Sequence, residues 1–185
     1  QKAKKGIRFI SFPPVLTMQL KRFEYNSKKE IMVKINDYFE FYDEIDLSKY
    51  IYSKDNNTND DNKYILHSVV VHQGNANSGH YFAFIKPTMN KGDWLQFNDE
   101  VVKPADNYEV FNQNYGGNYE VYKHKGKGEI ISNNVNYERT AYVLVYMKKS
   151  IASSLLEPVS INSIPVYLRK RFEKGKEEEE NNTRM

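Results

Sequence analysis

The sequence predicts a β-rich α+β fold built on an antiparallel sheet, and three observations support this fold class. Aromatic residues make up 14% of the chain, with 15 Tyr and 10 Phe, far more than disordered chains carry. Several stretches alternate apolar and polar residues with the period of two that half-buried strands show. Short polar turns join neighbouring stretches, as in hairpins. With 185 residues, the chain is long enough for one domain with a substantial core.

Composition argues against several classes of function. The formal charge of +3, from 27 basic and 24 acidic residues, is too small an imbalance to favour nucleic-acid binding. The chain has no cysteine, which removes disulfides, thiolate metal sites and a cysteine nucleophile. Its 4 histidines are scattered and lack a credible ligand set, so we expect neither a metal nor a cofactor.

The sequence also gives an expectation about location. No run of residues approaches the roughly 18 to 20 apolar positions of a membrane span. The first residues lead into only a short apolar patch, unlike a signal peptide. We therefore expect no membrane partner and a location in the nucleus, the cytoplasm or both.

The first third of the chain is expected to contain a β-hairpin. Residues 7–12 alternate weakly and end at two prolines, which cannot continue a ladder of hydrogen bonds. Residues 15–23 and 32–41 alternate with period two on either side of a polar turn, so we expect them to pair. Residues 53–63 have nothing apolar to bury and are predicted to form a flexible surface loop.

The middle of the chain predicts four strands. Residues 64–72 are largely apolar at consecutive positions, which is typical of a strand covered on both faces. Residues 80–86 are expected to return beside this strand after a connection of small residues at 73–79, forming a hairpin with a mobile tip. Two shorter strands are expected at 94–97 and 100–103.

The last part of the chain mixes structured and irregular segments. Residues 106–114 predict a short helix that ends near two glycines, and the glycine-punctuated stretch 119–139 is expected to be a flexible insertion. Residues 140–147 are β-branched and aromatic throughout and predict a central strand. Residues 150–185 form a predicted linker with a helix at about 164–178, for which a partner-binding role is the alternative.

The strongest chemical signal is a histidine followed by an amide and a carboxylate. His80 comes after the small residues Ser78 and Gly79, and Asn98 and Asp99 stand at the end of a later strand. A histidine that acts as a general base needs a partner that fixes its tautomer, and an Asn or Asp oxygen can accept Nδ1–H. The pattern is typical of a cysteine protease without its cysteine. A β-rich interaction domain in which these side chains merely pack is the alternative.

A series of short motifs makes the sequence recognisable. In chain order they are Pro13-Pro14-Val15-Leu16, Gln19-Leu20-Lys21-Arg22-Phe23, Lys34-Ile35-Asn36-Asp37, Tyr64-Ile65-Leu66-His67-Ser68-Val69, Gly79-His80-Tyr81, Trp94, Phe97-Asn98-Asp99 and Asn114-Tyr115-Gly116-Gly117. Over about residues 8–148, this series resembles the C-terminal half of the catalytic domain of the ubiquitin-specific proteases (ubiquitin carboxyl-terminal hydrolases, peptidase C19). Within that family it is most similar to the herpesvirus-associated ubiquitin-specific protease.

The resemblance implies a fold and a boundary. Catalytic domains of this family are papain-like and consist of fingers, palm and thumb, with the cysteine box in the thumb. Residues 1–149 would then supply the sheet of the palm and part of the fingers, and the nucleophilic cysteine would precede Gln1. The N-terminal half of the same domain is thus an expected partner, and the isolated chain is expected to be inactive.

The resemblance also implies a reaction and two roles at its centre. The parent protein would be a deubiquitinating thiol protease that cleaves the peptide or isopeptide bond after the C-terminal glycine of ubiquitin, with ubiquitin and ubiquitinated proteins as partners. His80 matches the catalytic base, and Asn98 matches the third triad position, which is Asp in some members. Asp99 matches the neighbouring position and could add a negative charge beside the ring. The alternative is a noncatalytic ubiquitin-binding scaffold from a pseudo-enzyme.

Five further positions match the channel that holds the extended ubiquitin tail, and the connection at residues 73–79 matches a blocking loop beside the active site. Tyr81 would flank the two terminal glycines of ubiquitin, where a narrow aromatic slot selects residues without side chains. For the channel positions Phe23, Tyr25 and His72, packing within the β core is an equal alternative to ubiquitin contact. The expected tail-binding residues are Tyr81, Phe23, Tyr25, His72 and Gly79.

Overall fold

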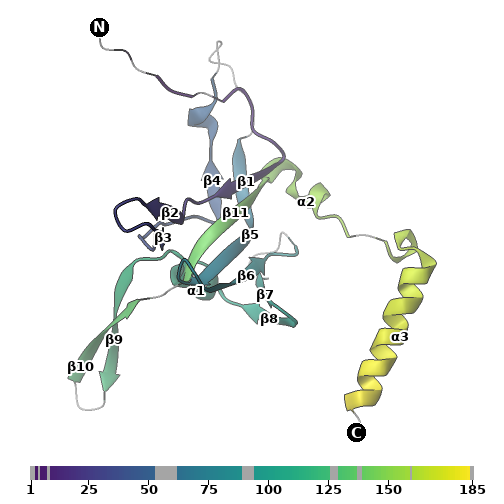
Figure 1. Cartoon of the computed structure of the whole chain (residues 1–185). Coiled ribbons are helices and arrows are strands. Elements are labelled where there is room, and N and C mark those ends of the chain that lie inside the picture. Colours follow the sequence, from purple (N-terminus) through teal and green to yellow (C-terminus); the bar gives the residue numbers. More distant parts are fainter. Residues whose placement is uncertain are drawn as a thin grey trace.

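The computed structural model describes residues 3, 5–7, 9–52, 62–88, 94–125, 129–136, 139–158 and 160–183. Across these residues, the main body is a 7-stranded antiparallel sheet in the order β1-β11-β5-β6-β7-β8, with β4 paired to β5 (Figure 1). Its strands are β1 (Val15–Gln19), β4 (Glu44–Asp46), β5 (Lys63–Gly74), β6 (Gly79–Ile85), β7 (Trp94–Asn98), β8 (Val101–Ala105) and β11 (Arg139–Lys148). This arrangement confirms the predicted β-rich, antiparallel α+β fold class.

Two hairpins and a few helices complete the described structure. The hairpins are β2 (Phe23–Asn26) with β3 (Ile31–Lys34), and β9 (Asn118–Lys125) with β10 (Glu129–Asn136). The helices are α1 (Asn107–Val110), α2 (Ala152–Leu155) and α3 (Val166–Thr183), with 3-10 turns η1 (Ser48–Tyr50), η2 (Asn112–Asn114), η3 (Lys149–Ile151) and η4 (Ile161–Ser163).

Strands β5 and β11 form the centre of the sheet. β11 lies between β1 and β5, and this confirms the central strand expected at residues 140–147. On β5, Tyr64, Leu66, Val69 and Val71 are fully buried, while the residues between them are mostly half-buried. Of the two faces that were expected to be covered, one therefore carries the core and the other is partly shielded.

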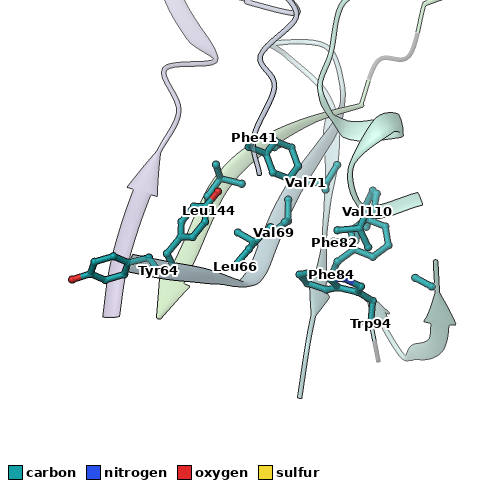
Figure 2. Packing of buried hydrophobic residues seen from close by; sticks show 13 residues of the cluster. Phe41, Tyr64, Leu66, Val69, Val71, Phe82, Phe84, Trp94, Val110 and Leu144 are labelled. Atoms are coloured by element: carbon teal, nitrogen blue, oxygen red, sulfur yellow. The ribbon is translucent and has the colours of Figure 1, made fainter. Parts of the chain in front are cut away.

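The core lies on one face of the sheet and holds it against α1 (Figure 2). Each fully buried large apolar side chain contributes about 1.5–3 kcal/mol relative to an exposed one. Trp94 is 2% exposed, packs edge-on against Phe111 and lies under the ammonium of Lys86, so it is a structural residue of the core. Other core members labelled in Figure 2 are Phe41, Tyr64, Leu66, Val69, Val71, Phe82, Phe84, Val110 and Leu144.

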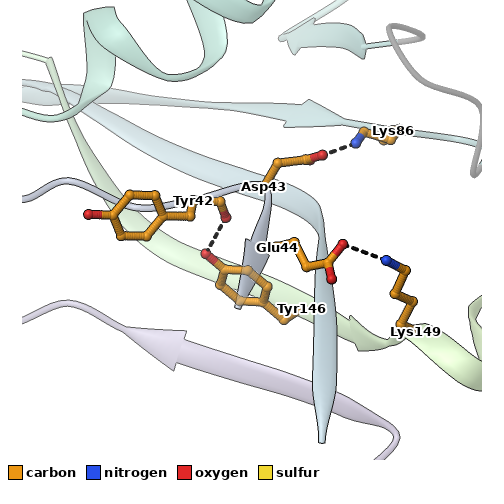
Figure 3. Close-up of polar contacts among 6 residues, drawn as sticks. All are labelled: Tyr42, Asp43, Glu44, Lys86, Tyr146 and Lys149. Carbon is orange, nitrogen blue, oxygen red and sulfur yellow. Dashed lines mark hydrogen bonds and ion pairs between the residues drawn. The ribbon is translucent and has the colours of Figure 1, made fainter. Parts of the chain in front are cut away.

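Three polar contacts hold residues 42–44, at the start of β4, against β11 and against the residues that follow β6 and β11 (Figure 3). They are the hydrogen bond from the Tyr146 hydroxyl to the Tyr42 carbonyl (2.7 Å) and the ion pairs of Lys86 with Asp43 (2.8 Å) and Lys149 with Glu44 (2.6 Å). The Lys86 side chain is only 7% exposed, so its pairing satisfies a charge that would otherwise be costly to bury.

The first hairpin differs from the expected one. Residues 15–19 pair with β11 in the main sheet, and the hairpin forms instead between β2 and β3. Between β1 and β2 lies Arg22, whose guanidinium is 4% exposed and donates to main-chain carbonyls from three other segments. This clasp separates the long predicted strand into two. Residues 9–12 form no strand and contribute one bridge between Phe9 and Ile51.

Two expected flexible segments have different outcomes. Residues 53–61 of the predicted loop lie outside the described residues. Within 119–139, the described backbone forms the β9–β10 hairpin, and the flexibility of this insertion stays a prediction. The stretches on either side of the glycines at 126 and 128 are rich in tyrosine, valine and isoleucine, and this β propensity outweighs their polar content.

Helix α3 lies apart from the sheet and is reached through a thin connection (Figure 1). It overlaps the helix expected at about 164–178 and begins directly after Pro165, which is suited to a helix start. Its Tyr167 and Phe172 are both 71% exposed. Among the described helices, none combines the length and apolar character needed to cross a bilayer.

Candidate active site

His80, Asn98 and Asp99 come together where β6 begins and β7 ends. The His80 Nε2 atom lies 2.5 Å from Asn98 Oδ1 and 3.7 Å from Asp99 Oδ2. The His80 side chain is 45% exposed and that of Asp99 is 76% exposed, so the ring is accessible to a further group. This proximity argues against the alternative in which the three side chains are unrelated.

The contact defines which ring nitrogen can act as a base. An amide oxygen only accepts hydrogen bonds, so Nε2 must carry a proton to bond with Asn98. Nδ1 is then the nitrogen with a free lone pair. The orienting bond thus lies at Nε2 and not at Nδ1, the nitrogen considered from the sequence, because the side-chain torsions that aim the ring cannot be inferred from spacing.

Local backbone geometry explains how Asn98 and Asp99 reach the histidine. β6 and β7 pair only over residues 83–85 and 95–97, so the strands are free to separate beyond this ladder. A two-residue turn joins β7 to β8, with Asn98 paired to Val101. Asp99 in this turn has a φ of 50°, in the left-handed region that Asp and Asn tolerate better than most residues.

An aromatic cluster lies on the other face of the same end of the sheet. Side chains of consecutive strand residues point to opposite faces, so Tyr81 and His80 diverge. Tyr81 is the cross-strand partner of His72, with ring centroids 4.7 Å apart. Phe23 packs edge-on against His72 at 5.1 Å, and Tyr142 lies 5.7 Å from Tyr81 and 5.8 Å from Phe23. We call these four residues the aromatic cluster.

The structure brings together most, not all, of the expected tail-binding residues. Phe23, His72 and Tyr81 belong to the aromatic cluster, whereas Tyr25 is 61% exposed on the β2–β3 hairpin. Sequence reasoning missed Tyr142. A bulge in the β5–β11 pairing falls between Ala141 and Val143, and such a register shift leaves no signal in a uniformly apolar strand.

Gly79 is required by the packing of this region. A Cβ atom at this position would lie 2.0 Å from His72 Nε2, which is far inside contact distance. His72 is 3% exposed, and burial lowers its pKa below the ordinary value of 6.5, with a further decrease from the nearby Lys34 ammonium. The imidazole of His72 is thus a neutral part of the aromatic cluster.

The connection between β5 and β6 is a tight turn closed by its own side chains. Asn75 Oδ1 accepts hydrogen bonds from the backbone N–H groups of Asn77 and Ser78, both at 2.9 Å. The Asn75 N–H also donates to the Ser78 carbonyl at 3.0 Å, and Gly74 has a φ of 112°, which strongly favours glycine. Metal-binding clusters of three or more His, Cys, Asp or Glu are absent from the described part of the chain.

Comparisons with known proteins identify the family of the chain. The model of the family "Ubiquitin carboxyl-terminal hydrolase" matches residues 2–146. The chain is 42% identical over 192 residues to Ubiquitin C-terminal hydrolase 12 of Arabidopsis thaliana, covering 100% of this chain and 17% of the relative. It is 39% identical over 171 residues to Ubiquitin carboxyl-terminal hydrolase 5 of Schizosaccharomyces pombe, covering 91% and 15%. For Ubiquitin carboxyl-terminal hydrolase 15 of Saccharomyces cerevisiae, the identity is 37% over 191 residues, with 97% and 15% covered. The chain thus spans 15–17% of the length of these relatives.

Proposed function

Because the chain belongs to the ubiquitin carboxyl-terminal hydrolase family, we propose that it carries the catalytic base of a deubiquitinating thiol protease. The reaction is cleavage of the peptide or isopeptide bond after the C-terminal glycine of ubiquitin. The observation that carries this proposal is the contact between His80 Nε2 and Asn98 Oδ1, which leaves Nδ1 on an accessible ring as a proton acceptor. The chain has no cysteine, so the thiol comes from another segment.

In the first half of the reaction, His80 Nδ1 takes the proton of the thiol, and the thiolate attacks the carbonyl carbon of the last ubiquitin glycine. When the tetrahedral intermediate collapses, the C–N bond breaks and the imidazolium gives its proton to the leaving amine. In the second half, His80 takes a proton from the water that attacks the thioester carbonyl. The C–S bond then breaks, ubiquitin leaves with a free carboxylate, and the imidazolium returns its proton to the thiolate.

Asn98 and Asp99 support these proton transfers in different ways. Asn98 keeps the proton on Nε2 and fixes the ring plane without adding charge. Asp99 places a largely exposed carboxylate 3.7 Å from the same nitrogen, so it is a second polar neighbour of the ring.

We propose that the N-terminal half of the same catalytic domain supplies the cysteine, and that this chain is the C-terminal half of a domain close to that of the herpesvirus-associated enzyme. An apolar groove of about 760 Å³ between the N-terminal segment, β1 and β4 supports a missing partner, because such a surface is costly to leave in water. Its apolar lining includes Phe9, Phe12, Leu16, Met18, Ile45 and Tyr50.

The ubiquitin tail is proposed to cross the end of β6 beside Gly79. Its side chains would contact the aromatic cluster on one face, and its terminal glycine would reach His80 on the other. Gly79 has no side chain to obstruct this crossing, and Tyr81 lies next to it with 49% of its surface exposed. The proposal explains why both faces of one strand end carry functional side chains.

The test compares the 185-residue chain alone with the chain joined, in cis or in trans, to the N-terminal half. The substrate is ubiquitin with a fluorogenic amine on its C-terminal glycine. We expect no turnover by the chain alone and turnover by the joined form. That turnover should be lost in His80→Ala and fall by about 100-fold in Asn98→Ala.

Exposed Glu100→Ala, in the same turn as Asp99, is the matched control and should retain activity. Turnover by the chain alone that disappears in His80→Ala would contradict the proposal. Ubiquitin binding by a joined form that lacks turnover would instead favour the noncatalytic scaffold, and the residue at the cysteine-box position would identify that case.

A further inference from the structure

A lysine outside the proposed catalytic residues holds the strand that lies opposite His80. Lys34 is the last residue of β3, on the hairpin that packs over the aromatic cluster. Its Nζ atom donates to the carbonyl of His72 at 3.1 Å and to the carbonyl of Gly74 at 2.8 Å. Hydrogen bonds from a charged donor are stronger than those between neutral groups.

The two carbonyls that Lys34 binds flank the residue paired with His80. Gln73 stands between them and is the direct cross-strand partner of His80 in the β5–β6 ladder. Alternate carbonyls of a strand point to the same edge, so one ammonium can hold both. Lys34 therefore fixes the short piece of β5 against which the backbone of His80 is aligned.

Hydrogen bonds connect this piece of β5 to the start of β6. The Gln73 side chain is held separately, because its Oε1 accepts from Arg139 Nε at 3.0 Å. Gly74 pairs with Gly79, and the turn between them is closed by hydrogen bonds of Asn75. A shift of β5 at Gly74 would therefore change the pairing at the start of β6, where His80 lies.

We propose that Lys34 is a positioning residue for His80. Its ammonium holds residues 72–74 so that Nδ1 of the histidine stays aligned with the incoming thiol. The proposal rests on the function proposed above. Lys34 also joins the β2–β3 hairpin, which carries Phe23, to β5 opposite His80. A ligand that contacts Phe23 in the aromatic cluster would therefore also influence the alignment of His80.

The experiment uses three substitutions and two measurements. Lys34→Met removes the ammonium and keeps most of the apolar stem, whereas Lys34→Arg retains a cation with several donors. Lys21→Met is the matched control, because the Lys21 side chain is 79% exposed and its ammonium lies 4.0 Å from Glu24. Amide hydrogen exchange of residues 79–82 is measured in the 185-residue chain, and kcat and KM are measured in the joined, cysteine-bearing form.

In Lys34→Met, we expect exchange at residues 79–82 to accelerate by at least about tenfold, since two charge-assisted hydrogen bonds are lost. The kcat value should fall by about tenfold, because a small misalignment of reacting groups is costly, while KM changes by less than about twofold. Lys34→Arg should restore most of both values, and Lys21→Met should behave as the wild type.

Unchanged kcat in an active Lys34→Met protein would overturn the proposal, as would a rise in KM alone. If Lys34→Met does not fold, Lys34→Gln, which can still donate to one carbonyl, should show an intermediate kcat, and a wild-type kcat in this variant would also overturn it. Absence of turnover by the wild-type joined form is a different result, because it contradicts the proposed function, whereas the exchange measurement still reports whether Lys34 holds the strand.

Discussion

At the scale of single residues, some side chains of the site could be predicted from the sequence, whereas others take part only because of how the chain folds. His80, Asn98 and Asp99 could be selected from residue type and spacing, because a base and its orienter need those side chains at two strand ends. The ring nitrogen that faces Asn98 depends on side-chain torsions. Tyr142 lies at a register shift in the β5–β11 pairing and contacts the aromatic cluster there. A register shift in an apolar strand cannot be predicted from the sequence.

The buried imidazole of His72 should make stability depend on pH. Because burial lowers its pKa in the folded state, the unfolded chain binds more protons below the ordinary value of 6.5. The free energy of unfolding should therefore decrease as the pH falls through 6.5, by at most about 1.4 kcal/mol per pH unit for this group. Urea unfolding followed between about pH 7.5 and 5 measures this slope.

His72→Phe keeps an aromatic ring and should reduce the slope. Burial also lowers the pKa of His67, so this second histidine contributes the remaining dependence, and the double variant His67→Leu/His72→Phe should be nearly flat over the same window. The quantity compared between variants is the change in the free energy of unfolding per pH unit. A packing change that does not depend on pH leaves this quantity unaltered. An unaltered slope in His72→Phe would contradict the assignment.

At the scale of elements, the pattern of apolar, β-branched and aromatic residues predicted β5, β6, β7, β8 and β11 well. It failed at the first hairpin, since β1 pairs with β11 at residues 143–147, far along the chain. Local patterns contain no information about such a distant partner. The burial of Arg22 could not be predicted either. In an alternating stretch, a charged residue is expected at an exposed position, whereas Arg22 is 4% exposed.

Arg22 binds four carbonyl oxygens that belong to three other segments. Its guanidinium donates to the carbonyls of Ala141 (3.2 Å), Ile35 (3.4 Å), Asp37 (2.6 Å) and Tyr115 (3.3 Å). Removal of these donors leaves buried carbonyls unpaired, so Arg22→Met should lower the free energy of unfolding by about 3 kcal/mol or more in urea denaturation.

Arg22→Lys should recover only part of this stability, because a compact ammonium cannot reach carbonyls on several sides as a planar guanidinium does. Arg171→Met, on an exposed part of α3, is the control and should change stability by less than about 0.5 kcal/mol. Equal stability of Arg22→Met and Arg171→Met would show that the clasp is energetically unimportant.

At the scale of the whole molecule, the sheet and α3 are nearly independent. Ala152 of α2 is 1% exposed and belongs to the body of the protein, whereas Tyr167 and Phe172 of α3 are mostly exposed. Composition indicated a change after residue 150, because charged residues gather from residue 169 towards the end. How far the helix stands from the sheet could not be inferred, since it depends on contacts that the sequence does not list.

Removal of α3 should therefore leave the sheet intact. A chain that ends at Pro158 keeps α2 and should unfold in urea within about 0.5 kcal/mol of the full chain. Near-UV circular dichroism, which reports on packed aromatic rings, provides the measurement. A truncated chain that is destabilised by more than about 1 kcal/mol would mean that α3 packs on the body in solution.

The strand order also implies a sequence of events during folding. His80 and Asn98 are 18 positions apart, on strands that follow each other along the chain, so loop closure costs little entropy and this pair can form early. The aromatic cluster needs β2 and β11, and its neighbouring Gln19–Tyr142 hydrogen bond joins residues 123 positions apart. Contacts of such high contact order form late. The proposed base would thus acquire its orienting amide before β2 and β11 complete the aromatic cluster.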